Sequence, residues 1–343
     1  MTNKYYEPKY LRGVIGKIAP LRLFFRQRFF SEGVTFPTES VSFEFAANKR
    51  LLLPYANVRA GAVPVDREGY QLKTFTPPLL SGSRTITPDT LATKMFGESP
   101  YNSGMTPDER AARIAANDLM ELQDALYRKE EYMCARVKQD GKLSIEGHGV
   151  SAEVDYGFDQ IESVKAADKW TVNYDILGKL AKTARELRKH GVNPDMLIVG
   201  ADVSEALSLN EGVLKLRHDQ FVKIPDPASR EDGITYLMQI RAPGLYLNVY
   251  EYNEYYTDEA GNLVPLIDAG TAIMMSSRER NLMLYGAVTY IDSRTRDYAT
   301  EMAEYVPYVI TEEDPPSRKL VVSSRCLPMP RDVNSWYVLK NLV

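Results

Sequence analysis

The sequence predicts an α+β protein, and three observations support that prediction. One long stretch has helical periodicity, a stretch rich in glycine and proline has the alternation of strands, and a helix–strand–helix succession follows them. The chain has 343 residues, which at roughly 150 residues per domain suggests two domains or one elongated one. Its composition, 44% hydrophobic and 26% charged, is that of a folded globular protein.

Charge and cysteine content exclude several classes of protein. The 42 Lys and Arg residues against 46 Asp and Glu give a net charge of −4, which argues against a dedicated nucleic-acid binder. The chain has no apolar run of the ~18 residues that cross a bilayer, and its start lacks the apolar segment of a secretory signal. Cys134 and Cys326 have no partner spacing, so we expect neither a disulfide nor a zinc site, and a reducing cytoplasm as the compartment.

Residues 1–28 read as an arm. They contain seven basic residues and one acidic residue, Glu7, with aromatic side chains between them. So short an apolar piece cannot form a core alone and must lie on another surface. That surface is its own domain, a neighbouring chain or a nucleic acid, and the acidic balance of the whole chain makes the nucleic acid the weakest of the three.

A polar β-hairpin is expected next. Val41–Leu53 reads as a strand, residues 54–90 have no helical period, Gln71–Thr76 alternates polar and apolar residues, and Asp66–Gly69 is a turn signal. Arms of ~12 residues at ~3.3 Å per residue reach about 40 Å. A compact chain of this length has a radius of gyration of only about 20 Å, so such a hairpin protrudes unless another chain covers it.

Residues 106–139 form the clearest helix of the sequence. Thr106-Pro107-Asp108-Glu109 is a capping box with Pro at the first helical position, and Gly141 follows the end of the pattern. At 1.5 Å per residue the helix is about 50 Å long. A coiled coil is the competing interpretation, but Lys129 interrupts the seam and the repeat covers fewer than four heptads, so we favour a long helix laid across a sheet. Its apolar stripe is Ala112, Ala115, Leu119, Leu122, Leu126, Met133 and Val137.

The second half of the chain contains a mixed α/β unit. A helix from about Asp175 to His190 closes at Gly191, a buried strand covers Met196–Gly200, and a short helix covers Val203–Leu209. The other predicted strands are Leu143–Val154, Tyr236–Arg241, Tyr246–Tyr255, Leu263–Ile267, Ala272–Met275, Leu282–Ile291, Leu320–Arg325 and Trp336–Leu339. A hairpin turn at 257–262 joins two of them.

No constellation of catalytic or ligand-binding residues stands out. Gly13–Lys17 lacks the spacing and the Ser or Thr of a phosphate-binding loop. The histidines, His148, His190 and His218, occupy unrelated elements, and Glu130 and Glu131 are adjacent on a helix and so point in different directions. We therefore assign no catalytic, cofactor-binding or metal-binding residue, and predict that the protein is not an enzyme.

Several segments follow one another in a characteristic order and spacing: Leu21–Arg26, Phe36–Val41, Phe75-Thr76-Pro77, the helix after Pro107, Asp268–Tyr285 and Ile310–Pro315. This order resembles that of lambda-type tailed-phage major capsid proteins, the major capsid protein E family. The resemblance covers nearly the whole chain, and no single motif is specific.

The resemblance implies the Hong Kong 97-type capsid fold. On this sequence it places an N-terminal arm at 1–45, an extension loop with a β-hairpin at 46–90, and an axial α/β domain at 171–290. The remaining residues, 91–170 and 291–343, then form a peripheral domain whose spine helix is 106–139. The loops near Asn210–Val213 and Tyr255–Asn262 are expected to crowd the centre of a ring of subunits.

The resemblance also implies function and partners. It predicts a structural head protein that self-assembles into hexamers and pentamers of an icosahedral shell around double-stranded DNA, which it touches by non-specific proximity. Decoration, scaffolding and portal proteins are further candidate partners, no cofactor or membrane is involved, and assembly takes place in the host cytoplasm. Candidate intersubunit contacts are Arg22, Phe24, Phe25, Arg26, Arg28, Asp66, Arg67, Glu68 and Lys73, with Arg22, Arg26 and Arg28 resting on the acidic surface of a neighbour.

Two alternatives remain open at this stage. One is another ring or tube protein of a phage particle, and the other is a cytoplasmic α/β enzyme whose site is assembled from scattered polar residues. Electron microscopy separates them, because shells, tubes and a small oligomer have different outlines.

Overall fold

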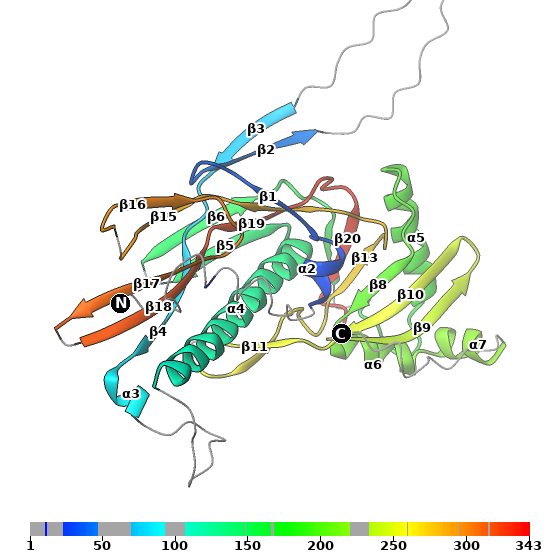
Figure 1. Ribbon diagram of the computed structural model, residues 1–343. Helices are drawn as coiled ribbons and strands as arrows, with labels where there is room; N and C mark the ends of the chain where they lie inside the picture. Colours follow the sequence, from blue (N-terminus) through cyan, green and yellow to red (C-terminus); the bar gives the residue numbers. More distant parts are fainter. Residues whose placement is uncertain are drawn as a thin grey trace, which may run out of the picture.

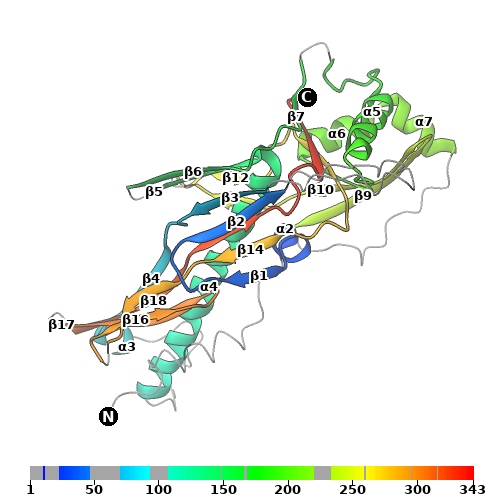
Figure 2. The same cartoon turned by 90° about the horizontal axis from the view of Figure 1, so that it is seen from above.

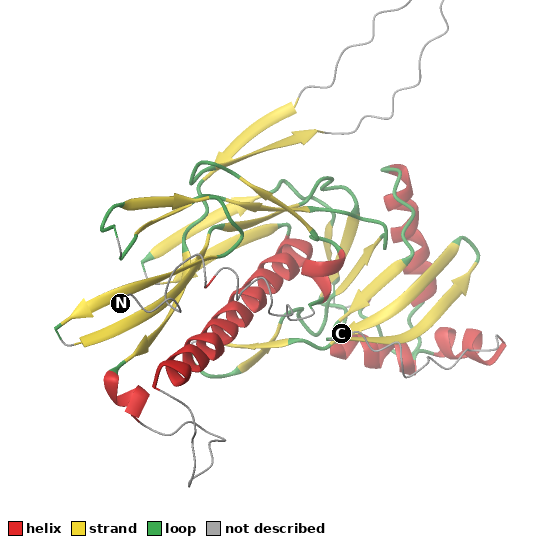
Figure 3. Cartoon of the chain, viewed as in Figure 1, coloured by secondary structure: helices red, strands yellow, loops and turns green. Residues whose placement is uncertain are grey.

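The computed structural model describes residue 11 and residues 23–46, 70–92, 107–147, 149–165, 168–219, 233–258, 260–293, 295–314 and 316–343. They contain both helices and strands, and strands alone follow α7 (Figure 3). The helices are α2 (Phe24–Arg28), α3 (Pro88–Ala92), α4 (Pro107–Asp140), α5 (Ile176–Lys189), α6 (Ala201–Leu209) and α7 (Glu211–Asp219). Strands of the first half are β1 (Glu32–Thr35), β2 (Val41–Ala46), β3 (Tyr70–Phe75), β4 (Leu80–Ile86), β5 (Lys142–Gly147), β6 (Val150–Asp155), β7 (Ile161–Ser163) and β8 (Met196–Val199). The remaining strands are β9 (Ile234–Ala242), β10 (Leu245–Tyr252), β11 (Tyr255–Thr257), β12 (Leu263–Pro265), β13 (Ala272–Met275), β14 (Leu282–Tyr285), β15 (Val288–Ile291), β16 (Tyr298–Glu301), β17 (Val306–Glu313), β18 (Pro316–Ser324), β19 (Cys326–Met329) and β20 (Trp336–Lys340).

The long helix α4 runs through the middle of an elongated molecule (Figure 1). Its 34 residues span about 51 Å at 1.5 Å per residue. The first half is amphipathic and packs Leu119, Leu122 and Leu126 against β17 and β18. The second half is buried on nearly every side, from Glu130 to Gln139. The predicted spine helix is confirmed, and it lies across strands rather than in a coiled coil.

One end of the molecule is an α/β unit. Its six-stranded sheet has the order β7-β20-β13-β8-β10-β9 and mixes parallel and antiparallel pairs. Because successive strand residues point to opposite faces, Met196 and Ile198 of β8 enter the core shared with α4, whereas Leu197 and Val199 enter the core that α5, α6 and α7 cover. Figure 2 shows these three helices at one end of the molecule, and β17 and β18 at the other.

The helix α5 shows how local sequence sets these elements. Asp175 caps its N-terminus by accepting a hydrogen bond from the Gly178 amide at 2.9 Å, and Gly191 follows its end with φ of 88°. This backbone conformation favours glycine. The helix predicted from Asp175 to His190 is therefore confirmed.

Smaller sheets form the rest of the body. The order β17-β18-β4 makes an antiparallel sheet beside the first half of α4, and β1-β14-β19 brings the N-terminal and C-terminal regions of the chain together. Strands β5 and β6 pair with each other, as do β15 and β16 and the short β11 and β12. Among the helices of the described ranges, none is long and apolar enough to span a membrane.

The β2–β3 hairpin stands apart from these sheets. The two strands pair antiparallel, from Val41 opposite Phe75 to Ala46 opposite Tyr70, and they form a two-stranded sheet of their own. The pair projects from one face of the body (Figure 1). Residues 47–69, which join the strands and include the predicted turn at Asp66–Gly69, lie outside the described residues.

Several predicted boundaries differ from the structure. The strand predicted at 282–291 is two strands, β14 and β15, separated by Gly286 and Ala287. The amides of these two residues donate to the carbonyl oxygens of Arg325 and Thr38 at 2.8 and 2.9 Å, and a Cβ on Gly286 would lie 2.5 Å from the Glu39 carbonyl oxygen. The helix stripe passes through Ala111 rather than Ala112, which is half-buried. The strand predicted at 246–255 ends at Tyr252, so the hairpin at 257–262 joins the short β11 to β12.

The division into four parts stays a prediction, but the sheets cross its boundaries. β20 pairs with β13 from Trp336 opposite Met275 to Leu339 opposite Ala272, and β7 pairs with the other edge of β20. Two strands of the predicted peripheral domain thereby join the sheet of the predicted axial domain. In addition, β4, from the predicted extension loop, pairs with β18.

The end of α4 yields a stability prediction. Gly141 has φ of +63°, and a Cβ there would lie 2.4 Å from the Phe158 Cβ. Gly149 has φ of +82° but open space around it. We expect Gly141→Ala to lower the free energy of unfolding by at least about 1 kcal/mol more than Gly149→Ala, since only the first adds a clash to the backbone strain. Urea unfolding measures both, and equal losses would contradict the packing described here.

Candidate assembly surfaces and the anchor of the arm

A buried carboxylate holds the N-terminal arm on the long helix. Glu131 of α4 accepts hydrogen bonds from the amides of Phe25 and Arg26, each at 2.8 Å, and from the Tyr252 hydroxyl at 2.6 Å. The two amides belong to the first turn of α2, whose N-cap residue Leu23 supplies no side-chain cap. First-turn amides have no partner within their own helix, so α4 supplies the cap that the local sequence of α2 lacks.

The neighbouring Glu130 holds the arm through Arg26. The Arg26 Nε lies 3.0 Å from the Glu130 Oε2, and the same carboxylate accepts hydrogen bonds from the hydroxyls of Tyr285 at 3.1 Å and Tyr305 at 2.9 Å. Arg26 also donates to the Phe30 carbonyl oxygen at 2.5 Å and to the Tyr285 hydroxyl at 2.9 Å. The cation and its carboxylate are thus fully partnered inside the protein.

Burial governs the electrostatics of this anchor. It raises the pKa of Glu130 above the ordinary value, and the Arg26 guanidinium opposes that rise. Burial also raises the pKa of Glu131, against the hydrogen bonds from Tyr252 and the two amides. Three donors on Glu131 and a guanidinium on Glu130 stabilise the ionised forms. Both carboxylates therefore act as acceptors that fix α2 in place.

The structure places the predicted contact residues as follows. Phe24 and Phe25 are buried, with ring centroids 5.3 Å apart, and Arg26 pairs with Glu130 of its own chain. Arg28 is half-buried, with its guanidinium 5.5 Å from the Phe24 ring centroid. Arg26 thus has an acidic partner, Glu130, within its own chain, and the contact of Phe24, Phe25 and Arg26 with a neighbouring subunit stays a prediction.

The other predicted contacts are less fully described. The backbone of Lys73 lies in β3, opposite Phe43. Arg22, Asp66, Arg67 and Glu68 lie outside the described residues. The intersubunit role of these residues and of Arg28 stays a prediction. The hairpin at 255–262 packs on α4, where the rings of Tyr256 and Tyr132 are 5.0 Å apart, and its expected place at the ring centre stays a prediction.

Sequence reasoning missed the two glutamates of the anchor. Because they are adjacent, the two side chains point in different directions, as the sequence indicates. Each of them nevertheless contacts a buried part of the arm, Glu130 the Arg26 guanidinium and Glu131 two amides of α2. The available signal is their place in the helix, between the buried Leu126 and Met133. A pair of charges inside an apolar stripe indicates that something covers the helix there.

Several large apolar side chains are exposed on the described part of the chain. On the outer face of the β15–β16 hairpin, Ile291 and Tyr298 lie opposite each other and are 54% and 82% exposed. Leu263 of β12 is 73% exposed. Large apolar side chains gathered on one face mark interaction sites more often than isolated ones do, so the β15–β16 face is the stronger candidate for a contact between subunits.

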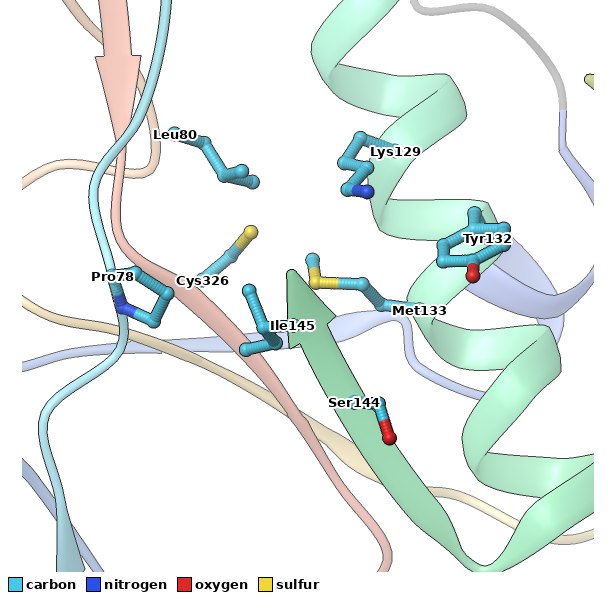
Figure 4. Close-up of a pocket in the computed structure, with 8 residues that line it drawn as sticks. All are labelled: Pro78, Leu80, Lys129, Tyr132, Met133, Ser144, Ile145 and Cys326. Carbon is cyan, nitrogen blue, oxygen red and sulfur yellow. The ribbon is translucent and has the colours of Figure 1, made fainter. Parts of the chain in front are cut away.

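The described residues offer little for chemistry. A small pocket lies between α4, β5 and the chain around Pro78 (Figure 4). Its lining is mostly apolar and includes Cys326, whose thiol has its pKa raised by burial, which makes it a poor nucleophile. No group of three or more His, Cys, Asp or Glu side chains within the described ranges is placed to hold a metal ion.

Comparison with solved structures identifies the fold. The chain is similar to a protein described as the capsid protein of an Escherichia coli prophage, with a TM-score of 0.68, 19% sequence identity and coverage of 96% of each chain. It is also similar to a phage-related protein from Bordetella bronchiseptica, with a TM-score of 0.53, 10% identity and coverage of 98% of this chain and 97% of that one. The chain thus has the Hong Kong 97-type capsid fold.

The family follows from the sequence itself. Residues 8–341 match the family described as phage major capsid protein E, and the chain belongs to that family. No curated protein matches the chain. Membership makes it a structural protein of the capsid shell, which associates with copies of itself and resides in the virion.

The anchor yields a second prediction. Glu130→Gln leaves the Arg26 guanidinium buried without its counter-charge, so we expect the free energy of unfolding to fall by about 3–5 kcal/mol. Glu121→Gln is the matched control, because Glu121 and its partner Arg84 have side chains that are 62% and 52% exposed. Such exposed pairs contribute less than about 1 kcal/mol. Urea unfolding compares the two, and losses of equal size would show that the buried pair does not hold the arm.

Proposed function

We propose that copies of this chain assemble into hexamers and pentamers of an icosahedral head that encloses double-stranded DNA, and that the β2–β3 hairpin clamps a neighbouring subunit. The observation that carries the clamp is the isolation of the hairpin. Its strands pair only with each other within the described residues, and the pair projects from the body (Figure 1). Isolated two-stranded hairpins are marginal in water, so a neighbouring surface is the natural place for this one.

Contacts at the base of the β2–β3 hairpin fix the direction in which it leaves the body. Val41 is buried, and the hydroxyls of Ser40 and Thr76 lie 2.7 Å apart. Arg325 donates to the Pro77 carbonyl oxygen at 3.0 Å, and its guanidinium lies 3.2 Å from the Glu39 carboxylate. The two strands therefore leave the body from a cross-braced point, which suits an element that must reach a defined place on another subunit.

Assembly from such subunits follows from symmetry. Head-to-tail contacts between unlike surfaces form a closed ring when the rotation from one subunit to the next adds up to a full turn. Each hairpin adds a contact that becomes intramolecular once a ring has formed, so modest contacts sum to a stable shell. The α/β unit with α5, α6 and α7 would then lie toward the ring centre, and the β17–β18 end toward the rim.

The remaining partners fit the chemistry of the chain. A net charge of −4 suits a lining that does not bind DNA tightly, because cationic contacts set non-specific affinity for DNA. We propose that the protein has no enzymatic activity, that it is assembled in the host cytoplasm, and that portal, scaffolding and decoration proteins are its other partners. Negative-stain microscopy of the purified protein tests the shell directly, since tubes or a small discrete oligomer would contradict it.

The clamp is tested by shortening the hairpin. Replacing residues 47–69 with Asn-Gly, a dipeptide that favours two-residue hairpin turns, keeps β2 and β3 paired from Ala46 opposite Tyr70. We expect the variant to fold with unchanged circular dichroism and to stay unassembled in size-exclusion chromatography and microscopy. Normal shells from this variant would end the clamp hypothesis and leave the family assignment intact.

The β15–β16 face gives a separate test of assembly. Tyr298→Ser removes a ring that is 82% exposed, so unfolding should change by less than about 0.5 kcal/mol, whereas shell yield should fall several-fold. Val343→Ser is the control, since that side chain is 47% exposed in another part of the molecule. Light scattering during assembly measures both variants, and equal yields would remove this face from the list of contacts.

A further inference from the structure

A lysine is buried at the end of the long helix. The side chain of Lys138, in the last turn of α4, has no exposed surface. Its Nζ lies 3.7 Å from the ring centroid of Trp336 and 5.8 Å from that of Phe30. A charged ammonium in so apolar a place needs a close partner, because burying an ion without one is costly.

The partner is Glu279, which also binds an asparagine. One carboxylate oxygen, Oε1, accepts hydrogen bonds from the Lys138 Nζ and from the Asn281 Nδ2, the latter at 3.0 Å. Asn281 is only 1% exposed. The other oxygen of Glu279, Oε2, is buried and has no hydrogen-bond partner among the described residues. A single oxygen shared by both nitrogens keeps them within about 6 Å of each other.

The amide of Asn281 is also activated from its other side. Its Oδ1 accepts a hydrogen bond from the Arg331 backbone amide at 3.2 Å. A donor on a carbonyl oxygen draws electrons from the carbon and stabilises the oxyanion that forms when a nucleophile attacks. An amine, a carboxylate that can carry a proton and a polarised amide carbonyl are thus gathered in one buried place.

We propose that Lys138 and Asn281 form an intramolecular isopeptide bond, with Glu279 carrying the protons. This bond goes beyond the role of the chain in the shell and does not depend on it. Lys179 provides a contrast within the described chain. It pairs with the carboxylate of Glu162, whose second oxygen accepts a hydrogen bond from the Tyr337 hydroxyl rather than from an amide.

The reaction balances without any added reagent. Glu279 takes a proton from the Lys138 ammonium, and the free amine attacks the Asn281 Cγ. The oxygen of the tetrahedral intermediate is held by the Arg331 amide. Glu279 then delivers its proton to Nδ2 and accepts one from Nζ, and the Cγ–Nδ2 bond breaks as the carbonyl re-forms. Ammonia leaves and takes up the proton that Glu279 accepted from Nζ, which returns Glu279 to its carboxylate form. Overall, the lysine ammonium and the asparagine amide become a secondary amide and an ammonium ion.

The surroundings favour the neutral amine that this step needs. Burial lowers the pKa of Lys138, although the Glu279 carboxylate opposes the change. Attack requires the Nζ to come to about 3–3.5 Å from the carbon, and rotation about the side-chain torsions of lysine can supply that approach. The aromatic rings keep water away from the site and so limit hydrolysis of the asparagine amide.

The bond would join two parts of the core. Lys138 ends the spine helix, and Asn281 directly precedes β14, the strand that pairs with both β1 and β19. The link would therefore tie α4 covalently to the sheet that carries the arm. A cross-link that closes so long a loop restricts the unfolded chain and raises stability.

Mass spectrometry of the full chain tests the proposal. After prolonged incubation of the folded protein at neutral pH, we expect an intact mass lower than the sequence mass by one ammonia. Trypsin should then release a branched peptide in which residues 137–142 are joined to residues 281–294, because modified Lys138 is no longer cleaved. An intact mass equal to the full sequence mass would overturn the proposal. So would a mass deficit without the branched peptide, which is the result that a succinimide at Asn281 would give.

Variants test the role of each group. Lys138→Met and Asn281→Leu should restore the full mass, and Glu279→Gln should restore it while leaving the amine and the amide in place. Lys179→Met should keep the deficit. A branched peptide that persists in Glu279→Gln would remove the carboxylate from the mechanism. The wild-type measurement decides whether the bond exists even where a variant fails to fold.

Discussion

The structure depends on the burial of the second half of α4. This helix is covered on one side by the six-stranded sheet and on another by α2, so its polar residues lie inside the protein together with its apolar ones. Charges in such a place must be paired or hydrogen-bonded. The pairs they make reach the arm through Glu130 and Glu131, the segment before β14 through Lys138, and the segment before β13 through Gln139 and Asp268. The helix is thus the point to which otherwise distant parts of the chain are fixed.

This arrangement gives direction as well as stability. An apolar arm alone could slide along an apolar groove, because hydrophobic contact is not directional. Glu131 instead captures two particular amides of α2, and Glu130 captures the guanidinium of Arg26. A buried ion pair is weak evidence for net stability, and in some proteins it contributes conformational specificity. Here the pairs set where the arm leaves the helix, and with it where β1 joins β14.

Much of the fold could be predicted because it follows local rules. The capping and periodicity of 106–139, the Asp175 cap with Gly191, and the alternation of 71–76 are all written in neighbouring residues, and each element lies where the pattern indicates. The burial of Arg26, Glu130 and Lys138 could not be predicted in this way, since their partners are more than 100 positions away. The same holds for β20, which joins β13 through a pairing that no local signal specifies.

Folding and assembly are linked by what a single subunit leaves uncovered. The body has its own cores, yet among the described residues β2 and β3 pair only with each other, and Ile291, Tyr298 and Leu263 remain exposed. A chain that folded for its own stability alone would tuck these parts against the body, because burying apolar surface is favourable at about 25 cal/mol per Å². The anchor at Glu130 and Glu131 holds the arm while leaving the hairpin free. The subunit can therefore be stable by itself and still gain further stability from its neighbours, which is the condition for a shell that assembles from folded parts.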